Sequence, residues 1–532
     1  MTLRPASLTR NLATKSAGYL IALLLAFVTF PVMLHHLGPA RYGVWMLIAE
    51  LTVYYTYLDL GICSAVVYYV ANHLAQSQTA DLSQTVSTAF WSVTGIGCVL
   101  SLVGFAVAWI FPATFHLAGN GALEASRTIV IVTLAAGISQ PLELICSTLN
   151  GCRRQDVVNI IDAAVSAASS IASLACVFEG GGLLALSLIQ LSAKLLELAW
   201  VFAALHRVLP GISLAPRLWT RSCLRRLTGF GLQSMLINFC SLASSRADLL
   251  VVGAFAGVRM VPFYGIPRNL IEYGISGIRA VTSPFCAHLT HLHAAHRREE
   301  TTALFLRGAR ISGAAAFLFT AYIAAFGRSF LRLWQGPAFV SGPVRDRADI
   351  VLIILAVAFL PRLLHSISVQ FLYATRRLSF MVGLHCLEAV FRIALSLALV
   401  ARWGLTGVAV ANLIPIFLLQ GLAVPGYLCR TFSFPLGTYL ADAIARPFAV
   451  GLFAYLLSMI LTTSIDPATW PIFLAEATIA AAFGALFAGV IASDASERQT
   501  LWNRIASCPA TTGPSRGEDD PRSIVGWRQE VY

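Results

Sequence analysis

Charged side chains interrupt the long apolar stretches of this sequence, where each would cost about 2.5–3.5 kcal/mol if it faced the centre of a lipid bilayer. They are Glu50, Asp59, Glu143, Asp162, Lys194, Glu197, Arg246, Asp248, Arg268, Glu272, Arg279, Arg362, Glu388, Arg392, Asp442, Arg446 and Glu476. A membrane chain can carry so many charges only if most of them face protein or water. We therefore expect the functional groups to be among them.

Three of these charges share one face of the apolar stretch 261–287. At about 100° per residue of an α-helix, Arg268, Glu272 and Arg279 fall within roughly 40° of one another. A charged stripe along one helix predicts the wall of a water-filled cavity. The alternative is that the arginines extend toward the membrane surface from the ends of the helix.

A second stripe occupies the stretch 43–72. If this stretch is one regular helix, Glu50, Tyr54, Tyr57 and Tyr68 lie within about 40° of one line. A carboxylate beside aromatic rings and hydroxyl groups offers a surface on which sugars can stack, so we expect Tyr54 and Tyr57 to face the sugar of a ligand. Tyrosines near the ends of membrane helices more often belong to the interfacial aromatic belt, which is the alternative for Tyr68.

Carboxylates inside the membrane can also couple transport to Na⁺ or H⁺, and the candidates for this role are Glu50, Asp248 and Glu272. Several acids stand three or four residues from a base, so neutralisation within one helix is the simpler alternative. These pairs are Arg268–Glu272, Glu388–Arg392, Asp442–Arg446 and Lys194–Glu197. The sequence has no Cys/His metal spacing and no set of nucleophile, base and acid, so we expect no metal, no cofactor and no catalytic residue.

The elements that must position these charges are membrane helices. The chain has 532 residues, of which 57% are hydrophobic and 12% are charged, about half of the charged fraction of soluble proteins. This composition excludes several soluble domains, a disordered chain and a disulfide scaffold, and it predicts an all-α polytopic membrane protein. We expect about fourteen transmembrane helices, near 16–37, 43–72, 87–111, 127–149, 157–178, 182–205, 228–256, 261–287, 308–330, 348–373, 378–401, 404–428, 438–462 and 470–492.

The pattern of the chain also predicts its organisation. Residues 31–45 and 248–266 both run from an apolar helix through a glycine and a short Arg-bearing turn into a second helix, which indicates a repeated six-helix unit. The expected parts are an N-terminal six-helix lobe (1–222), a C-terminal six-helix lobe (223–432), two additional transmembrane helices (433–492) and a disordered cytoplasmic tail (493–532).

The basic excess helps to orient the chain in its membrane. The net charge is +12, and the arginines concentrate in one set of loops, which is typical of the cytoplasmic side of a membrane protein rather than of nucleic-acid binding. We therefore expect a multi-pass protein of the bacterial cytoplasmic (inner) membrane, with both termini in the cytoplasm.

Short motifs carry a resemblance to a known family. Leu34, Gly38, Tyr42, Gly43 and Trp45 form the pattern LxxLGxxxYGxW, and Asp-Leu-Gly follows at 59–61. Together with 247–266, these motifs resemble the polysaccharide-exporter branch of the MOP superfamily. That branch contains flippases for O-antigen and other lipid-linked oligosaccharides, and it is similar to the lipid II flippases.

The resemblance implies two six-helix lobes around a central cavity and alternating access between its two sides. It implies transport of a polyprenyl-pyrophosphate-linked oligosaccharide, such as an O-antigen, exopolysaccharide or capsule repeat unit, with the bilayer and glycan-assembly proteins as its other partners. Arg246, Arg268 and Arg279 are then the expected pyrophosphate-binding residues. The first helix departs from the pattern of the lipid II flippases, because its basic residues Arg10 and Lys15 lie only at its start.

Two other functions fit parts of the sequence. A multidrug or metabolite exporter of the same superfamily shares the architecture, but cationic drugs favour an acidic cavity rather than one with arginines. A membrane-embedded glycan polymerase or acyltransferase is less favoured, because polymerases resemble one another in a large outer loop that this chain lacks. We therefore expect a transporter and not an enzyme.

Overall fold

The computed structural model describes residues 8–492 except for 57, 77, 376–377 and 433–435. Within these residues every regular element is a helix. The α-helices are α1 (Leu8–Thr56), α2 (Ile62–Ala75), α3 (Thr79–Thr114), α4 (Gly119–Gly151), α5 (Gln155–Phe178), α6 (Leu183–Val208), α7 (Arg221–Val251), α8 (Val261–Ala294), α9 (Arg298–Gln335), α10 (Ala348–Leu364), α11 (Ser366–Ala374), α12 (Leu378–Ile416), α13 (Val424–Phe432), α14 (Leu436–Leu440), α15 (Arg446–Ser464) and α16 (Trp470–Ala492). Shorter 3₁₀ or π segments are η1 (Pro216–Leu218), η2 (Val252–Ala256), η3 (Val258–Met260), η4 (Pro337–Phe339), η5 (Val344–Asp346), η6 (Phe417–Ala423) and η7 (Ala441–Ala445).

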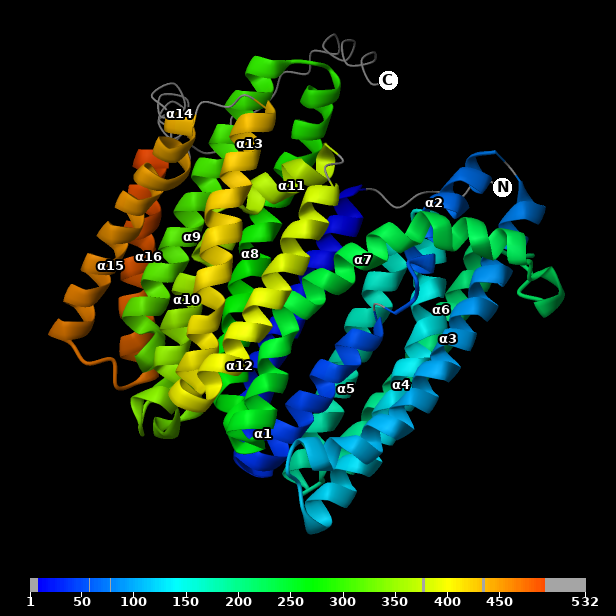
Figure 1. Ribbon diagram of the computed structural model, residues 1–532, viewed down its shortest axis with the longest axis horizontal. Helices are drawn as coiled ribbons and strands as arrows, with labels where there is room; N and C mark the ends of the chain where they lie inside the picture. The colour runs from blue at the N-terminus through cyan, green and yellow to red at the C-terminus, as the bar shows by residue number, and fades with distance from the viewer. Residues whose placement is uncertain (1–7, 57, 77, 376–377, 433–435, 493–532) are drawn as a thin grey trace, which may run out of the picture.

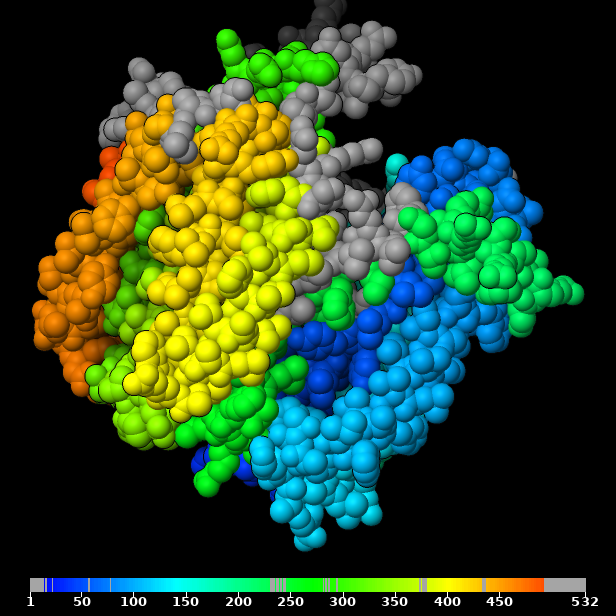
Figure 2. Space-filling view, in the orientation of Figure 1, coloured from blue at the N-terminus to red at the C-terminus, as the bar shows by residue number. Residues whose placement is uncertain are grey.

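The helices form two groups that diverge from one end of the molecule (Figure 1). Helices α2 to α6 pack against one another in the right-hand group, and α8 to α16 make up the left-hand group. Helix α7 runs diagonally between the groups and contacts α2 and α3 as well as α12. The space-filling view shows this face hollowed between α12, in yellow, and α3, in light blue (Figure 2).

Two glycine turns join the groups at the end where they converge. Gly38 (φ 74°, ψ 164°) divides α1 into two helices, and Gly257 (φ 91°, ψ 155°) separates η2 from η3. Both adopt a positive φ that side chains with a Cβ disfavour. The turns also touch each other, because a Cβ on Gly43 would lie 1.9 Å from the carbonyl oxygen of Val258. The similarity between 31–45 and 248–266 thus corresponds to two turns of similar backbone conformation in direct contact.

The structure corrects the prediction of one continuous helix over 43–72. Helix α1 ends at Thr56 and α2 begins at Ile62. Between them Leu60 has a φ of 56° and Gly61 a φ of 71°, and the carboxylate of Asp59 accepts hydrogen bonds from the backbone N–H groups of Gly61 and Cys63 at 3.1 and 3.0 Å. The break stabilises the start of α2, so the tyrosine stripe does not continue along one helix into α2.

Most other predicted spans coincide with observed helices. Among the described residues, nine helices are long and apolar enough to cross a membrane, or ten if α10 and α11, which are bent by 43°, form one span. This count takes α1 as one helix in spite of its kink at Gly38, and it takes 380–432 as one helix in spite of the kink at Gly404 in α12. Each of these two helices contains two predicted spans. The all-α membrane fold is therefore confirmed, whereas the number fourteen and the lobe boundaries stay predictions. The tail 493–532 lies outside the described residues.

The core and the outer surface are both apolar. Leu47, Val252 and Leu352 are completely buried between α1, η2 and α10, whereas Trp109 and Leu102 on α3 are largely exposed. Large exposed apolar side chains are unfavourable in water but favourable against lipid. The helices thus present to the membrane the kind of surface that the hydropathy predicts.

Candidate functional site

A polar cavity of about 520 Å³ lies between α1, α7, α8, α10, α11, α12 and η6. Its polar lining consists of Ser245, Arg246, Glu272, Arg279, Arg362, Ser366, Gln370, His385 and Gln420. With three arginines and one carboxylate, this lining has a net positive charge. The predicted residues Arg246, Arg279 and Glu272 therefore meet at one cavity, although they come from two helices.

Glu50 of α1 holds two arginines together beside this cavity. Its Oε1 lies 2.6 Å from Nη1 of Arg268 and 3.2 Å from Nη1 of Arg246. Arg268 is almost completely buried and does not line the cavity, whereas the side chain of Arg246 is about one-third exposed. Arg268 thus occupies a position behind the cavity wall, where it orients Glu50 and through it Arg246.

The spacing-based pairing of Arg268 with Glu272 is wrong. Within the described part of the chain the ion-pair partner of Arg268 is Glu50, and the two side chains of the predicted pair form no ion pair within 4 Å. A helical spacing of four residues permits a contact, but Glu50 of α1 lies 2.6 Å from the same guanidinium. Glu272 lines the cavity instead.

The other three pairs that the spacing predicts are confirmed. Lys194 lies 2.7 Å from Glu197, and Arg446 lies 2.8 Å from Asp442. Nη1 of Arg392 lies 3.4 Å from Glu388, but its other terminal nitrogen turns to a different helix.

Asp248 of α7 receives three hydrogen bonds at its Oδ2. Arg392 donates to it at 2.9 Å, the hydroxyl of Tyr264 at 3.0 Å and the side-chain amide of Asn412 at 3.1 Å. All four side chains are buried. Asp248 is thus already neutralised by a guanidinium, and the group joins α7, α8 and α12. Arg392 was among the predicted membrane charges, but only as a partner of Glu388. Asn412 was missed, although a polar residue in the middle of an apolar stretch was a sequence signal for it.

Glu388 of α12 organises the far side of the cavity. It accepts hydrogen bonds from Arg362 at 2.8 Å, from Gln420 at 2.9 Å and from Arg392 at 3.4 Å. The shared residue Arg392 connects Glu388 to Asp248, so one chain of charged side chains extends from α7 to α10. Buried carboxylates that hold arginines in this way fix the direction of each guanidinium without an external ligand.

The three arginines of the lining differ in how much charge they can offer to a ligand. Arg246 shares Glu50 with Arg268, and Arg362 is paired with Glu388. Arg279 is exposed and has no ion pair with any described residue. The strongest anion-binding position in the cavity is therefore near Arg279 and Arg246, where bidentate and permanently charged donors suit a phosphate.

Of the two predicted tyrosines, only Tyr54 is among the described residues, and it does not line the cavity. Tyr54 is half-buried on α1 near Glu50, but its neighbour Val53 is the residue that lines the cavity. Tyr57 lies outside the described residues. A sugar-facing role for either tyrosine stays a prediction. Among the described residues, no group of three or more His, Cys, Asp or Glu side chains could hold a metal ion.

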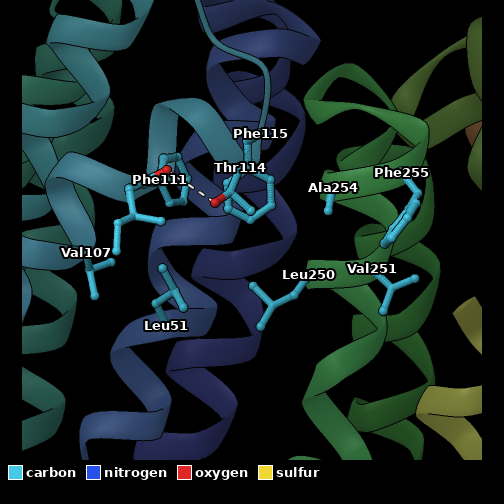
Figure 3. A pocket seen from close by; sticks show the side chains of 10 residues that line it. Leu51, Val107, Phe111, Thr114, Phe115, Leu250, Val251, Ala254 and Phe255 are labelled. Carbon is cyan, nitrogen blue, oxygen red and sulfur yellow. Dashed lines mark hydrogen bonds between the residues drawn. The ribbon is translucent and has the colours of Figure 1, made fainter.

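A second cavity of about 370 Å³ is almost entirely apolar (Figure 3). Leu51 of α1, Phe111 of α3, Phe115 directly after α3, and Leu250 and Phe255 of the α7–η2 segment line it. Apolar walls cannot compensate the desolvation of an anion. This cavity therefore suits hydrocarbon, and the charged group of a ligand belongs in the first one.

Known proteins resemble this chain in sequence and in fold. A family model described as "Polysaccharide biosynthesis protein" matches residues 22–338. The structure is similar to lipid II flippase MurJ in an inward closed conformation, with a TM-score of 0.69 and 11% identity over 92% of this chain and 99% of that one. It is also similar to an inward-facing multidrug resistance MATE transporter of the MOP superfamily, with a TM-score of 0.64 and 12% identity over 77% and 95%.

No curated protein matches the sequence. At 11–12% identity the two structures establish the fold alone, and the expected MOP-superfamily architecture is confirmed.

Proposed function

We propose that this chain, which belongs to the polysaccharide biosynthesis protein family, is a flippase that moves a polyprenyl-pyrophosphate-linked oligosaccharide across the bacterial cytoplasmic membrane. Its family, its MOP fold and its apolar helices support a multi-pass membrane transporter. The proposal goes beyond the family and the fold in three respects, which are the lipid-linked substrate, the inner-membrane location and the cytoplasmic termini.

The observation that carries this proposal is the cationic lining of the polar cavity. Arg246, Arg279 and Arg362 line one cavity with a single carboxylate, Glu272. A pyrophosphate is multiply anionic, and guanidinium groups are permanently charged donors whose geometry suits bidentate binding of its oxygens. The polyprenyl tail can stay in lipid or in apolar recesses while the polar head crosses through the cavity.

The direction of transport agrees with the charge of the substrate. An inside-negative potential favours outward movement of an anion by about 2.3 kcal/mol per charge per 100 mV. The flipped product can be an O-antigen, exopolysaccharide or capsule repeat unit, which a glycan polymerase then extends outside the membrane.

Among the three candidate carboxylates, Glu272 is the one that can couple transport to Na⁺ or H⁺. The other two candidate carboxylates are each neutralised by arginine, Glu50 by Arg268 and Asp248 by Arg392. Glu272 lines the cavity and has no ion pair among the described residues. A carboxylate in contact with the cavity can exchange a proton or Na⁺ during transport, whereas one held by a buried arginine would first have to break that pair.

The test is a transport assay that compares substrate classes. The purified protein is reconstituted in liposomes, and the inward or outward movement of a labelled polyprenyl-pyrophosphate oligosaccharide is measured beside the uptake of a lipophilic cationic drug. We expect movement of the lipid-linked sugar without drug transport. Drug transport without movement of the lipid would contradict the proposal and support the multidrug alternative.

A further inference from the structure

The polar cavity has two walls with different chemistry. The wall from α7 and α8 carries Arg246, Glu272 and Arg279, and Arg279 has no ion pair with a described residue. The opposite wall, from α10 to η6, carries Arg362, Gln370, His385 and Gln420. We call it the amide wall, defined by Arg362, His385 and Gln420. The two walls are therefore suited to different parts of one ligand.

The amide wall is close to electrically neutral. Nη2 of Arg362 lies 2.8 Å from Oε1 of the completely buried Glu388, and Nε2 of Gln420 donates to Oε2 of the same carboxylate at 2.9 Å. The carboxylate thus balances the one guanidinium of this wall and orients the amide group of Gln420. What this wall can offer to a ligand is mainly hydrogen bonding.

Two atoms of the amide wall lack the hydrogen bonds that they could make. Nδ1 of His385 and Oε1 of Gln420 are buried and have no hydrogen-bond partner among the described residues. Oε2 of Glu388 lies 4.0 Å from Nδ1 of His385, which exceeds hydrogen-bond distance. The side chains of His385 and Gln420 are more than nine-tenths buried, yet both border the cavity. Unsatisfied buried polar atoms are costly. Because both side chains border the cavity, a rotation toward it would let a ligand satisfy these two atoms.

The two atoms define the groups that a ligand must present. Oε1 of Gln420 accepts only, so it requires an O–H or N–H donor, while Nδ1 of His385 can donate or accept according to its tautomer. A sugar offers such groups side by side, as neighbouring hydroxyls or as a hydroxyl beside an acetamido group. A second phosphate offers acceptors alone and cannot satisfy Oε1 of Gln420.

We propose that the amide wall binds the sugar next to the pyrophosphate through its hydroxyl or acetamido groups, while Arg246 and Arg279 hold the pyrophosphate. This inference rests on the proposed function. The pyrophosphate and the first sugar are covalently adjacent, and both walls border the same cavity of about 520 Å³, a volume that is ordinary for a site holding a small polar ligand. The amide wall thus recognises a sugar on the lipid carrier rather than the carrier alone.

The test separates sugar binding from pyrophosphate binding. The full-length protein in nanodiscs is titrated with polyprenyl pyrophosphate and with the same lipid carrying one N-acetylhexosamine. We expect the wild type to bind the sugar-bearing lipid more tightly. In His385→Leu/Gln420→Met its affinity for that lipid should fall about 10-fold, as expected for two lost hydrogen bonds of ordinary net strength, while the affinity for the sugar-free lipid changes less than 2-fold.

Two further variants keep the result interpretable. His385→Asn retains a side-chain amide in place of the ring nitrogen and should preserve part of the sugar preference. If the double variant does not elute as a monodisperse species, His385→Leu alone is titrated with the same two lipids in its place. An equal loss of affinity for both lipids, or an unchanged preference for the sugar-bearing lipid, would show that the amide wall does not bind the sugar. The proposed function would be unaffected. A wild type that binds neither lipid would overturn both.

Discussion

Arg246 of α7 reaches Glu50 of α1 at 3.2 Å, and the same carboxylate oxygen lies 2.6 Å from Arg268 of α8. Glu50 therefore connects three helices, and only Arg246 among the three side chains lines the polar cavity. An anion that binds Arg246 competes with Glu50 for the same guanidinium. Substrate binding and the packing of α1 against α7 and α8 are coupled through this contact.

Removal of the Glu50 charge should destabilise the protein. Glu50→Gln leaves the guanidinium of Arg268 buried without its carboxylate, and loss of one partner of a buried ion pair costs about 3–5 kcal/mol. We expect a clear fall in the melting temperature of the purified protein. Size-exclusion chromatography after heating measures this temperature. Glu300→Gln, which breaks an exposed pair with Arg297, is the matched control and should change the melting temperature little. Equal melting temperatures for both variants would show that Glu50 does not hold the helices together.

The buried pair of Asp248 and Arg392 predicts a strong interaction between two substitutions. Asp248→Asn and Arg392→Met should each destabilise the protein, because the first leaves Arg392 with only its longer contact to Glu388 and the second leaves the buried Asp248 without a cation. The double variant should be more stable than the sum of the two losses predicts, since neither charge then remains. Chemical unfolding in detergent of the four proteins measures this coupling. Additive losses would contradict a direct pair.

Much of this arrangement could be predicted from the sequence, but not which helices meet. The apolar stretches locate most helices, and the spacing identifies pairs such as Asp442–Arg446. Spacing along one helix cannot show that Arg268 points to Glu50, 218 residues away in sequence. For the same reason Asn412 gave no sign of its contact with Asp248. The break at Gly61 was missed because the surrounding hydropathy continues across it.

Trp334 of α9 should stabilise the turn of α1 that contains Pro31. Pro31 has no N–H, so the carbonyl of Phe27 loses its usual helical donor, and Nε1 of Trp334 donates to that oxygen at 2.8 Å. Trp334→Phe should cost about 1 kcal/mol of unfolding free energy through this bond. In a Pro31→Ala background the helix can supply its own donor, so the same substitution should cost less. A cost that is equal in both backgrounds would assign the effect to ring packing alone.

Close packing of the two glycine turns predicts that Gly43→Ala is poorly tolerated. The added Cβ would lie 1.9 Å from the backbone oxygen of Val258, and a backbone atom cannot move aside as a flexible side chain can. We expect a large loss of folded protein in membranes, measured by fluorescence-detected size exclusion. Gly95→Ala is the control, because its Cβ would meet no atom within 4 Å. Similar yields for the two variants would mean that the turns can separate without cost.

The most direct test of the account measures flipping by variants of the cationic wall. Wild type, Arg246→Gln/Arg279→Gln and the control Arg297→Gln are reconstituted with a labelled polyprenyl-pyrophosphate oligosaccharide, and the label reaching the opposite leaflet is followed with a membrane-impermeant glycosidase. Loss of two charge-assisted contacts should slow the double variant by about 100-fold or more, while the exposed-loop control keeps the wild-type rate. A double variant that flips the lipid as fast as the wild type would contradict the assignment of this cavity as the pyrophosphate site.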